Sequence, residues 1–265
     1  MVAQKLVSKV IGGVSVMWDH ELDVIYTEDP RFDVPFCRNQ SGVDADICFE
    51  ATTYCNVACA NCFSESLPSR PGQHLPLQSI VDHLTSSRSG LLRACITGGE
   101  PLMHPDIKGI LELPSRYCDV GFVLTTNGTI QPSLDVAMAH HGWLVCVSIH
   151  GTREAHNEYE RHDTHGLAVA RLCNLSEQGA TTHIYAVLHR KFRTEDLEFL
   201  LQLRERCGAR MLRLIVPRPY GRHESVNPVE SRVAVAPYLS KQCVLVCESS
   251  GSPFVDVRGE RRTSH

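Results

Sequence analysis

Short apolar runs alternate with amphipathic stretches along most of the chain. The apolar runs are typical of strands buried on both faces, and six are present: 46–51, 94–97, 120–125, 144–149, 183–188 and 211–216. Between them, several stretches place apolar residues at three- and four-residue spacing, which predicts helices at 77–84, 105–113, 133–140, 165–178 and 194–207. A strand followed by a helix, repeated along the chain, implies parallel strands joined by right-handed crossovers.

The two ends of the chain depart from this alternation. Two short alternating runs within 13–26 predict a hairpin that caps a barrel, and 254–260 is predicted to be a hairpin fragment. The expected fold class is α/β: a partial (β/α)6 TIM-like barrel at 44–222, with a short hairpin-like N-terminal extension at 1–43 and a short C-terminal tail at 223–265. A single barrel fits this length, because barrels of roughly 200 to 250 residues are commonly one domain.

Composition narrows the class of protein. The chain has 265 residues, 43% hydrophobic and 21% charged, with a formal net charge of −4, as in ordinary globular proteins without a general attraction to nucleic acid or anionic lipid. No apolar run approaches the roughly 20 residues of a membrane span, and the N-terminus is too short in apolar residues for a signal peptide. We therefore expect a cytoplasmic protein with no nucleic-acid or membrane partner. Its twelve cysteines are then expected to be reduced thiols or metal ligands.

Three cysteines stand apart from the others. Cys55, Cys59 and Cys62 follow the first predicted strand within eight residues, at the barrel face where active sites form. Three thiolates in one loop can converge on an iron–sulfur cluster. Zinc would require a fourth ligand, which is absent locally, whereas a four-iron cluster with three protein ligands keeps one iron open. A zinc knuckle completed by a distant histidine, or a chance grouping, is the alternative interpretation.

The C-x3-C-x2-C spacing after the first strand resembles that of the radical S-adenosylmethionine (SAM) superfamily. A second motif, Gly98-Gly99-Glu100-Pro101 at the end of the second strand, is similar to the family's GGEP element, which in relatives contacts the amino group of the methionine moiety. Glycines allow close backbone approach, and a carboxylate accepts charge-assisted hydrogen bonds from an ammonium. The resemblance implies a 4Fe-4S cluster on the three cysteines and SAM at its open iron.

Further matches extend the resemblance over roughly 46–222. Thr126-Asn127-Gly128 is similar to the family's TNG element. Ser148 and Arg161 match positions that relatives use for the ribose and carboxylate of SAM. Residues 216–222 resemble the PxGR-like loop of the molybdenum-cofactor and SPASM branches. The residue before the third cysteine, often aromatic in the family, is Asn61, so the adenine contact is expected from Phe63, Leu188 or backbone.

No general acid or base is singled out by the sequence. His104 and His150 lie beside the cofactor motifs and either face the substrate or have a surface or core role. A set of charged residues just after the fourth strand is expected to be a solvated helix face: Glu154, His156, Glu158 and Glu160.

The resemblance also implies an activity. The cluster would reduce SAM to release a 5′-deoxyadenosyl radical that abstracts hydrogen from a ribosomally made peptide, with flavodoxin or ferredoxin as reductant. Cys243 and Cys247, followed by 254–260, resemble the start of the auxiliary-cluster extension of peptide-maturing members, so 223–265 is expected to be a truncated form of it. Two alternatives stay open: small-molecule tailoring in cofactor, nucleoside or antibiotic biosynthesis, and a non-catalytic zinc or iron–sulfur binding module.

Overall fold

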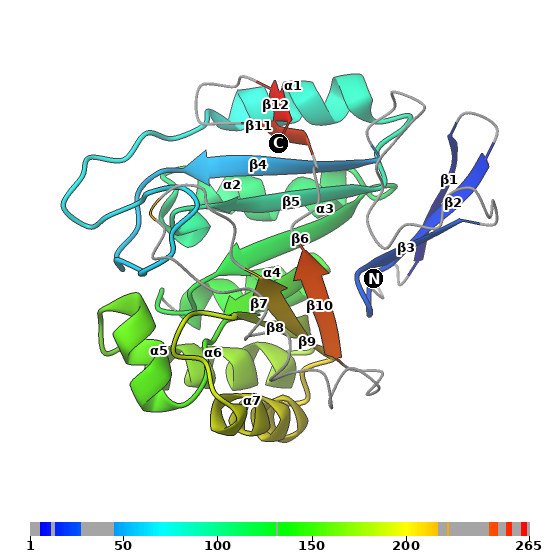
Figure 1. Cartoon of the computed structure of the whole chain (residues 1–265). Helices are drawn as coiled ribbons and strands as arrows, with labels where there is room; N and C mark the ends of the chain where they lie inside the picture. Colours follow the sequence, from blue (N-terminus) through cyan, green and yellow to red (C-terminus); the bar gives the residue numbers. More distant parts are fainter. Residues whose placement is uncertain are drawn as a thin grey trace.

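The computed structural model describes residues 6–11, 14–27, 45–130, 132–216, 222, 244–248, 253–255 and 261–263. Within these, all six predicted strands are confirmed and lie parallel in chain order (Figure 1). They are β4 (Asp46–Thr52), β5 (Arg93–Gly98), β6 (Gly121–Thr126), β7 (Leu144–Ser148), β8 (Thr181–Val187) and β9 (Met211–Val216). Among the described residues the two ends of the sheet do not pair with each other, so the barrel is partial, as predicted.

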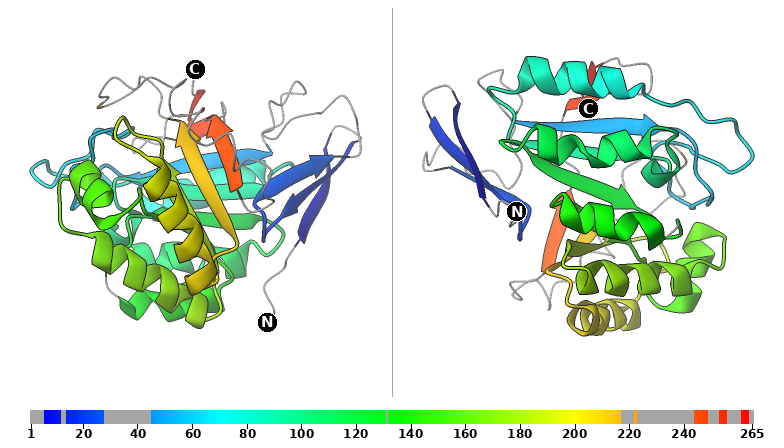
Figure 2. Two further views of the ribbon diagram at one scale, coloured as in Figure 1. Left: turned by 60° about the horizontal axis from the view of Figure 1, so that its bottom comes forward. Right: turned by 180° about the vertical axis from the view of Figure 1, so that it is seen from behind.

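Helices connect the strands and cover one face of the sheet (Figure 2). They are α1 (Leu77–Ser87), α2 (Ile107–Leu111), α3 (Leu113–Arg116), α4 (Asp135–His140), α5 (Arg153–Glu160), α6 (His165–Glu177) and α7 (Thr194–Cys207), with 3-10 turns η2 (Pro101–Met103) and η3 (Pro132–Leu134). The single helix predicted at 105–113 is instead two short helices. The break falls at Glu112, because Pro114 has no N–H to donate to the Ile110 carbonyl of a continuous helix and lies instead in the first turn of α3.

Side chains alternate between the two faces of the sheet. Ile47, Phe49 and Ala51 of β4 belong to the main hydrophobic core with the helices, as do the corresponding residues of the other strands. The residues between them, Cys48 and Glu50 among them, therefore point to the opposite, concave face. This face carries polar groups and thiols as well as apolar groups.

The N-terminal extension is a three-stranded antiparallel sheet of β1 (Leu6–Ile11), β2 (Val14–Asp19) and β3 (Val24–Thr27). The predicted hairpin is confirmed as β2 and β3, and β1 is an addition. This sheet lies beside the N-terminal ends of the main strands (Figure 1). Trp18 is fully buried there over Gly121, whose missing side chain makes room for the indole, since a Cβ would lie 2.1 Å from the Trp18 ring.

The described parts of the tail join the main sheet. β10 (Val244–Glu248) pairs in parallel with β9, and β11 (Pro253–Val255) pairs in parallel with β4. β12 (Arg261–Thr263) pairs antiparallel with β11, which confirms the predicted hairpin fragment. Cys247 lies in β10, whereas Cys243 and residues 217–221 of the predicted PxGR-like loop are outside the described residues.

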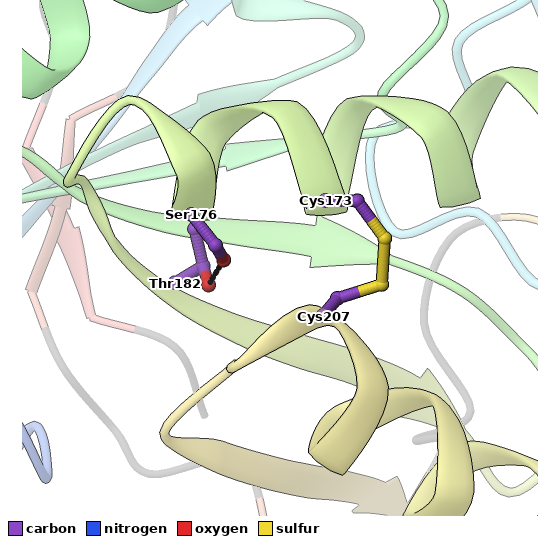
Figure 3. Close-up of a disulfide and its surroundings, with 4 residues drawn as sticks. All are labelled: Cys173, Ser176, Thr182 and Cys207. Carbon is purple, nitrogen blue, oxygen red and sulfur yellow. Dashed lines mark hydrogen bonds between the residues drawn. A yellow bond between two sulfur atoms is a disulfide. The ribbon is translucent and has the colours of Figure 1, made fainter.

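One expectation about the cysteines is wrong. Cys173 of α6 and Cys207 of α7 form a disulfide, next to the 2.7 Å hydrogen bond between Ser176 and Thr182 (Figure 3). The seven other cysteines whose state the structure describes are free thiols, including all three of the motif. No described helix is long and apolar enough to cross a bilayer.

Candidate active site

The cysteine loop lies at the C-terminal edge of the sheet, directly after β4, and is held by backbone hydrogen bonds. The amides of Ala58 and Ala60 donate to the carbonyls of Glu160 (3.2 Å) and Tyr159 (2.8 Å) at the end of α5. On the other side, Cys62 and Arg222 exchange two backbone hydrogen bonds of 2.9 Å each.

Two side chains complete this support. The Arg222 guanidinium donates to the carbonyls of Cys59 (2.7 Å) and Ser66 (3.0 Å), and the Tyr159 hydroxyl donates to the Asn61 carbonyl (2.8 Å). The loop conformation is therefore set by α5 and by the segment that carries Arg222.

The three thiols suit a cluster better than a single ion. Cys55 is buried, Cys59 and Cys62 are half-buried, and the three influence one another electrostatically. Their sulfurs are not all within 4.8 Å of one another, however, as three ligands of one ion would be. Thiolates on one tetrahedral zinc lie about 3.8 Å apart. Burial raises the pKa of Cys55 to about 12, so the bound metal would have to stabilise the thiolate.

The backbone of the Gly98–Pro101 motif lies in close contact with the backbone that leads into the cysteine loop. The amide of Gly99 donates to the Thr52 carbonyl at 2.6 Å, and that of Glu100 to the Tyr54 carbonyl at 2.8 Å. A Cβ on Gly98 would lie 2.3 Å from the Thr52 oxygen, and one on Gly99 would lie 2.1 Å from the Tyr54 oxygen. The pair of glycines is thus required to join the two motifs.

The Glu100 carboxylate lies at the centre of the site and is fully buried. Its Oε1 accepts from the Thr126 hydroxyl (2.8 Å) and the Leu102 amide (3.1 Å), and its Oε2 accepts from the Asn127 amide (2.8 Å). Burial raises the pKa of Glu100 to about 7, although these hydrogen bonds favour the ionised form. Pro101 begins the η2 turn that supplies the Leu102 donor.

Asn127 connects the carboxylate to the cysteines. Its side-chain nitrogen lies 3.8 Å from Cys55 Sγ and donates to the side-chain oxygen of Asn56, Oδ1, at 2.9 Å. The structure therefore brings together the ends of β4, β5 and β6, with five predicted site residues around Cys55: Gly98, Gly99, Glu100, Thr126 and Asn127.

The remaining predicted residues are more spread out. Ser148 is half-buried at the end of β7, on the concave face. Arg161 is exposed at the end of α5, with a left-handed φ of 58°. Leu188 is fully buried in the core that packs under the helices, and Phe63 is 57% exposed.

Both histidines beside the motifs are buried and hydrogen-bonded. His104 Nε2 bonds to the Leu75 carbonyl at 2.9 Å, and its Nδ1 accepts from the Asp106 amide at 3.0 Å. Burial lowers its pKa. His104 therefore has a core role, and it fixes the turn before α2.

A polar cluster on α5 was not anticipated from the sequence. Glu154 and Glu158 are exposed, as predicted, but the expectation of a solvated face is wrong for His156 and Glu160, which are fully buried. The Thr164 hydroxyl donates to Glu160 Oε2 at 2.5 Å, and His156 Nε2 lies 3.4 Å from the same oxygen. The four-residue spacing of 156 and 160 on one helix face was the available signal.

His150 completes this cluster, and its geometry opposes a metal site. Its Nε2 lies 3.8 Å from Glu160 Oε1, so three potential ligands converge. However, the Val187 amide donates to His150 Nδ1, and the His150 amide donates to His156 Nδ1, both at 3.2 Å. A ring whose Nδ1 accepts a hydrogen bond has its proton on Nε2, which in both rings faces Glu160, where a metal would need a lone pair. Burial, with His156 and His189 nearby, lowers the pKa of His150 well below its usual value.

Two buried polar atoms border the site without a hydrogen-bond partner among the described residues, Ser66 Oγ and Glu160 Oε1. Ser66 lies beside Gly99, and Glu160 acts electrostatically on Cys59. Unsatisfied buried groups are rare in folded proteins. Together with the three thiols, they fit a site that holds a cluster and a polar cofactor.

Comparisons with known proteins agree with this geometry. Mycofactocin maturase MftC of Mycobacterium ulcerans (strain Agy99) is 31% identical over 194 residues, covering 71% of this chain and 52% of that protein. A probable GTP 3′,8-cyclase of Aeropyrum pernix is 30% identical over 191 residues, covering 68% of this chain and 53% of that protein. The chain thus spans about half the length of the curated relatives it matches.

Among solved structures, Streptococcus suis SuiB bound to the precursor peptide SuiA has the same fold. It superposes with a TM-score of 0.72 at 12% sequence identity, covering 92% of this chain and 71% of SuiB. The sequence profile of the Radical SAM superfamily matches residues 49–203, which include the three cysteines, the Gly98–Pro101 motif and the ends of β4 to β8. On this match and the geometry of the site, the chain belongs to the Radical SAM superfamily.

Proposed function

We propose that this chain is a SAM-cleaving radical enzyme that matures a ribosomally made peptide. The observation that carries the proposal is the convergence of Cys55, Glu100 and Asn127, which joins the three-thiol loop to a buried carboxylate through Asn127. When bound, a 4Fe-4S cluster and SAM supply a 5′-deoxyadenosyl radical that abstracts hydrogen from a substrate. The protein binds these groups, orients them and excludes water from them.

Each site residue has a task in this proposal. Cys55, Cys59 and Cys62 would hold the cluster. Glu100 Oε2 accepts one hydrogen bond from the described residues, and since a carboxylate oxygen has two lone pairs, it has capacity for the SAM ammonium. The glycines, Pro101, Thr126 and Asn127 hold that carboxylate in place.

The other SAM contacts follow from positions at the same edge of the sheet. Ser148 would bond the ribose, and Arg161 would pair with the methionine carboxylate, a task for which a guanidinium fork is suited. Since Leu188 lies in the core under the helices, the adenine contact would come from Phe63 or from backbone.

A peptide substrate is supported by two relatives, the maturase MftC and the SuiB structure with its precursor peptide. We expect flavodoxin or ferredoxin as the reductant, and the cytoplasm as the compartment. The similarity to a GTP 3′,8-cyclase favours a second candidate, the tailoring of a small molecule. Turnover with peptides but not with nucleotides would separate the two.

The test of the chemistry is anaerobic. The full chain is reconstituted with iron and sulfide, reduced with dithionite and given SAM, and 5′-deoxyadenosine is quantified. We expect production that disappears when Cys55, Cys59 and Cys62 are all changed to alanine and persists in Cys118→Ala, which removes an exposed thiol far from the motif. A loaded cluster without any 5′-deoxyadenosine would instead indicate a non-catalytic binding module.

A further inference from the structure

Glu160, the last residue of α5, is a fully buried carboxylate to which no task is assigned above. The end of a helix is an unfavourable place for a negative charge, because the last carbonyls of the helix already carry partial negative charge. Burial adds to the cost, since the charged group loses its hydration. A carboxylate at this position therefore lowers the stability of the fold, so the fold alone does not account for it.

The groups that face this carboxylate are hydrogen-bond donors. The Thr164 hydroxyl accepts from His156 Nε2 at 3.2 Å and donates to Glu160 Oε2 at 2.5 Å. His156 Nε2 lies 3.4 Å from the same oxygen, and His150 Nε2 lies 3.8 Å from Oε1. Both Nε2 atoms carry a hydrogen, because the Nδ1 atom of each ring accepts from a backbone amide. Donors favour the ionised form of a carboxyl group, so Glu160 carries a negative charge.

The ion-pair partners of this charge among the described residues are two histidines, His150 and His156. Burial keeps the pKa of His150 well below its usual value, so this ring is neutral near neutral pH. The guanidinium that supports the cysteine loop, that of Arg222, donates to backbone carbonyls instead. In the part of the chain that the structure describes, Glu160 is thus a fixed charge without a lysine or arginine partner.

Glu160 lies against the cysteine loop. Its carbonyl accepts from the amide of Ala58, the residue directly before Cys59, at 3.2 Å. Its carboxylate acts electrostatically on Cys59 and Cys55 and opposes negative charge on both sulfurs. Its Oε1 is buried without a hydrogen-bond partner among the described residues, so no donor offsets the charge on that oxygen. A charge that opposes negative charge on the ligand sulfurs also opposes an electron added to the metal group that they hold.

We propose that the buried Glu160 carboxylate lowers the reduction potential of the cluster held by the cysteine loop, an inference that rests on the proposed function. The potential of an iron–sulfur cluster depends on the net charge around it. Reduction adds one electron from a ferredoxin- or flavodoxin-type carrier, and the fixed charge of Glu160 disfavours this addition by Coulomb repulsion. A lower potential increases the driving force for transfer of that electron to SAM and requires a carrier of low potential.

The test is a potentiometric titration of the reconstituted full chain without SAM. The potential is set anaerobically with dithionite and redox mediators, and the reduced cluster is quantified by electron paramagnetic resonance. Glu160→Gln keeps the shape of the side chain and removes its charge. We expect the ratio of reduced to oxidised cluster at a fixed potential to rise about tenfold in this variant. For a one-electron couple, a tenfold change is a shift of about 59 mV to less negative potential.

Further variants separate charge from packing. Glu160→Met also removes the charge, with an apolar side chain that suits a buried position, and should give the same rise. Glu160→Asp keeps the charge and changes the packing, so its potential should stay close to that of the wild type. Glu154→Gln removes an exposed carboxylate from the first turn of the same helix, where water and salt screen the charge, and should leave the potential unchanged.

The outcomes separate this inference from the proposed function. A potential equal to that of the wild type in either folded, charge-free variant, or an equal shift in Glu160→Gln and Glu160→Asp, would overturn the electrostatic role of Glu160. Either result would leave the proposed chemistry intact. Failure of the wild type to load a cluster on its three cysteines would overturn the proposed function, and this inference with it. Iron content and thermal melting of each variant verify that the protein is loaded and folded.

Discussion

At the scale of single residues, the close approach of two backbone segments requires glycine at both positions before Glu100. Gly99 has an ordinary backbone conformation, so its requirement is purely steric: its missing side chain is what lets Glu100 bond to the Tyr54 carbonyl. Glu100 in turn is positioned by the same contact. The motif therefore has a structural role, which is to hold two loops together, in addition to its proposed role in binding SAM.

Gly99→Ala should disrupt the contact between these two loops. Its Cβ would lie 2.1 Å from the Tyr54 oxygen, and such overpacking costs about 1–3 kcal/mol of unfolding free energy. We also expect weaker SAM binding, measured by equilibrium dialysis on the reconstituted protein. Gly166→Ala is the control, because the nearest atom there is the end of a flexible arginine at 3.3 Å. SAM binding equal to wild type in Gly99→Ala would contradict the close approach.

Single residues also show which parts of the site could be predicted from the sequence. Cys55, Gly99 and Glu100 were predictable because chemistry restricts those positions to one residue type. Glu160 was not, because a glutamate on a polar helix is usually solvated, and only the packing of His150 and Thr164 around it determines its burial. The pairing of Cys48 with Cys95 likewise depends on strand register, which apolar periodicity does not specify.

At the level of elements, α5 supports the cysteine loop. Its last carbonyls accept the Ala58 and Ala60 amides, and its Tyr159 hydroxyl reaches the Asn61 carbonyl. The six strands were predictable as apolar runs, but the α5 segment was singled out only for its exposed charges. Its buried residues, His156, Tyr159 and Glu160, are polar or amphipathic, so hydrophobic periodicity carries little signal.

Tyr159→Phe should loosen the loop without removing a ligand. The lost hydrogen bond costs about 1 kcal/mol, and we expect faster loss of iron to a chelator from the reconstituted protein. Tyr117→Phe is the matched control, since it removes a hydroxyl bonded to Thr85 at 2.9 Å, on α1 and away from the cysteines. Equal rates of iron loss in the two variants would argue against a supporting role for α5.

At the level of the whole molecule, the N-terminal sheet is tied to the barrel by buried charge. The Asp23 carboxylate lies 2.6 Å from Arg93 and 3.1 Å from Arg213, and it accepts from the Trp18 indole at 2.7 Å. Burial alone would raise the pKa of Asp23, but the two guanidinium groups lower it to about 2. The network thus joins β2 and β3 to the first residues of β5 and to β9.

Asp23→Asn should be strongly destabilising. Asn tolerates the left-handed φ of 51° at this position, so the change isolates the charge. Arg93 keeps its ion pair with Asp46, whereas the buried Arg213 loses the carboxylate 3.1 Å away, and removing one partner of a buried ion pair costs about 3–5 kcal/mol. Chemical denaturation measures the loss. Asp119→Asn breaks an exposed pair with Arg88 and should cost at most about 1 kcal/mol. A similar small loss in both variants would mean that the buried network contributes little.

The same interface should make the whole fold acid-sensitive through His183. Its Nε2 bonds to the Glu21 carbonyl at 2.8 Å, and burial, with Arg213 nearby, lowers its pKa from 6.5 to about 4 despite Asp23. Because the unfolded chain binds this proton at higher pH than the folded one, stability is fully present above pH 6.5 and falls as the pH drops toward 4.

The drop attributable to His183 is at most about 3 kcal/mol, measured as unfolding free energy against pH. His183→Gln should flatten the profile in this window, while His20, whose pKa burial also lowers, keeps part of the slope. The exposed His162→Gln is the control and should leave the profile unchanged. If His183→Gln keeps the full slope, the acid sensitivity arises from other groups than His183.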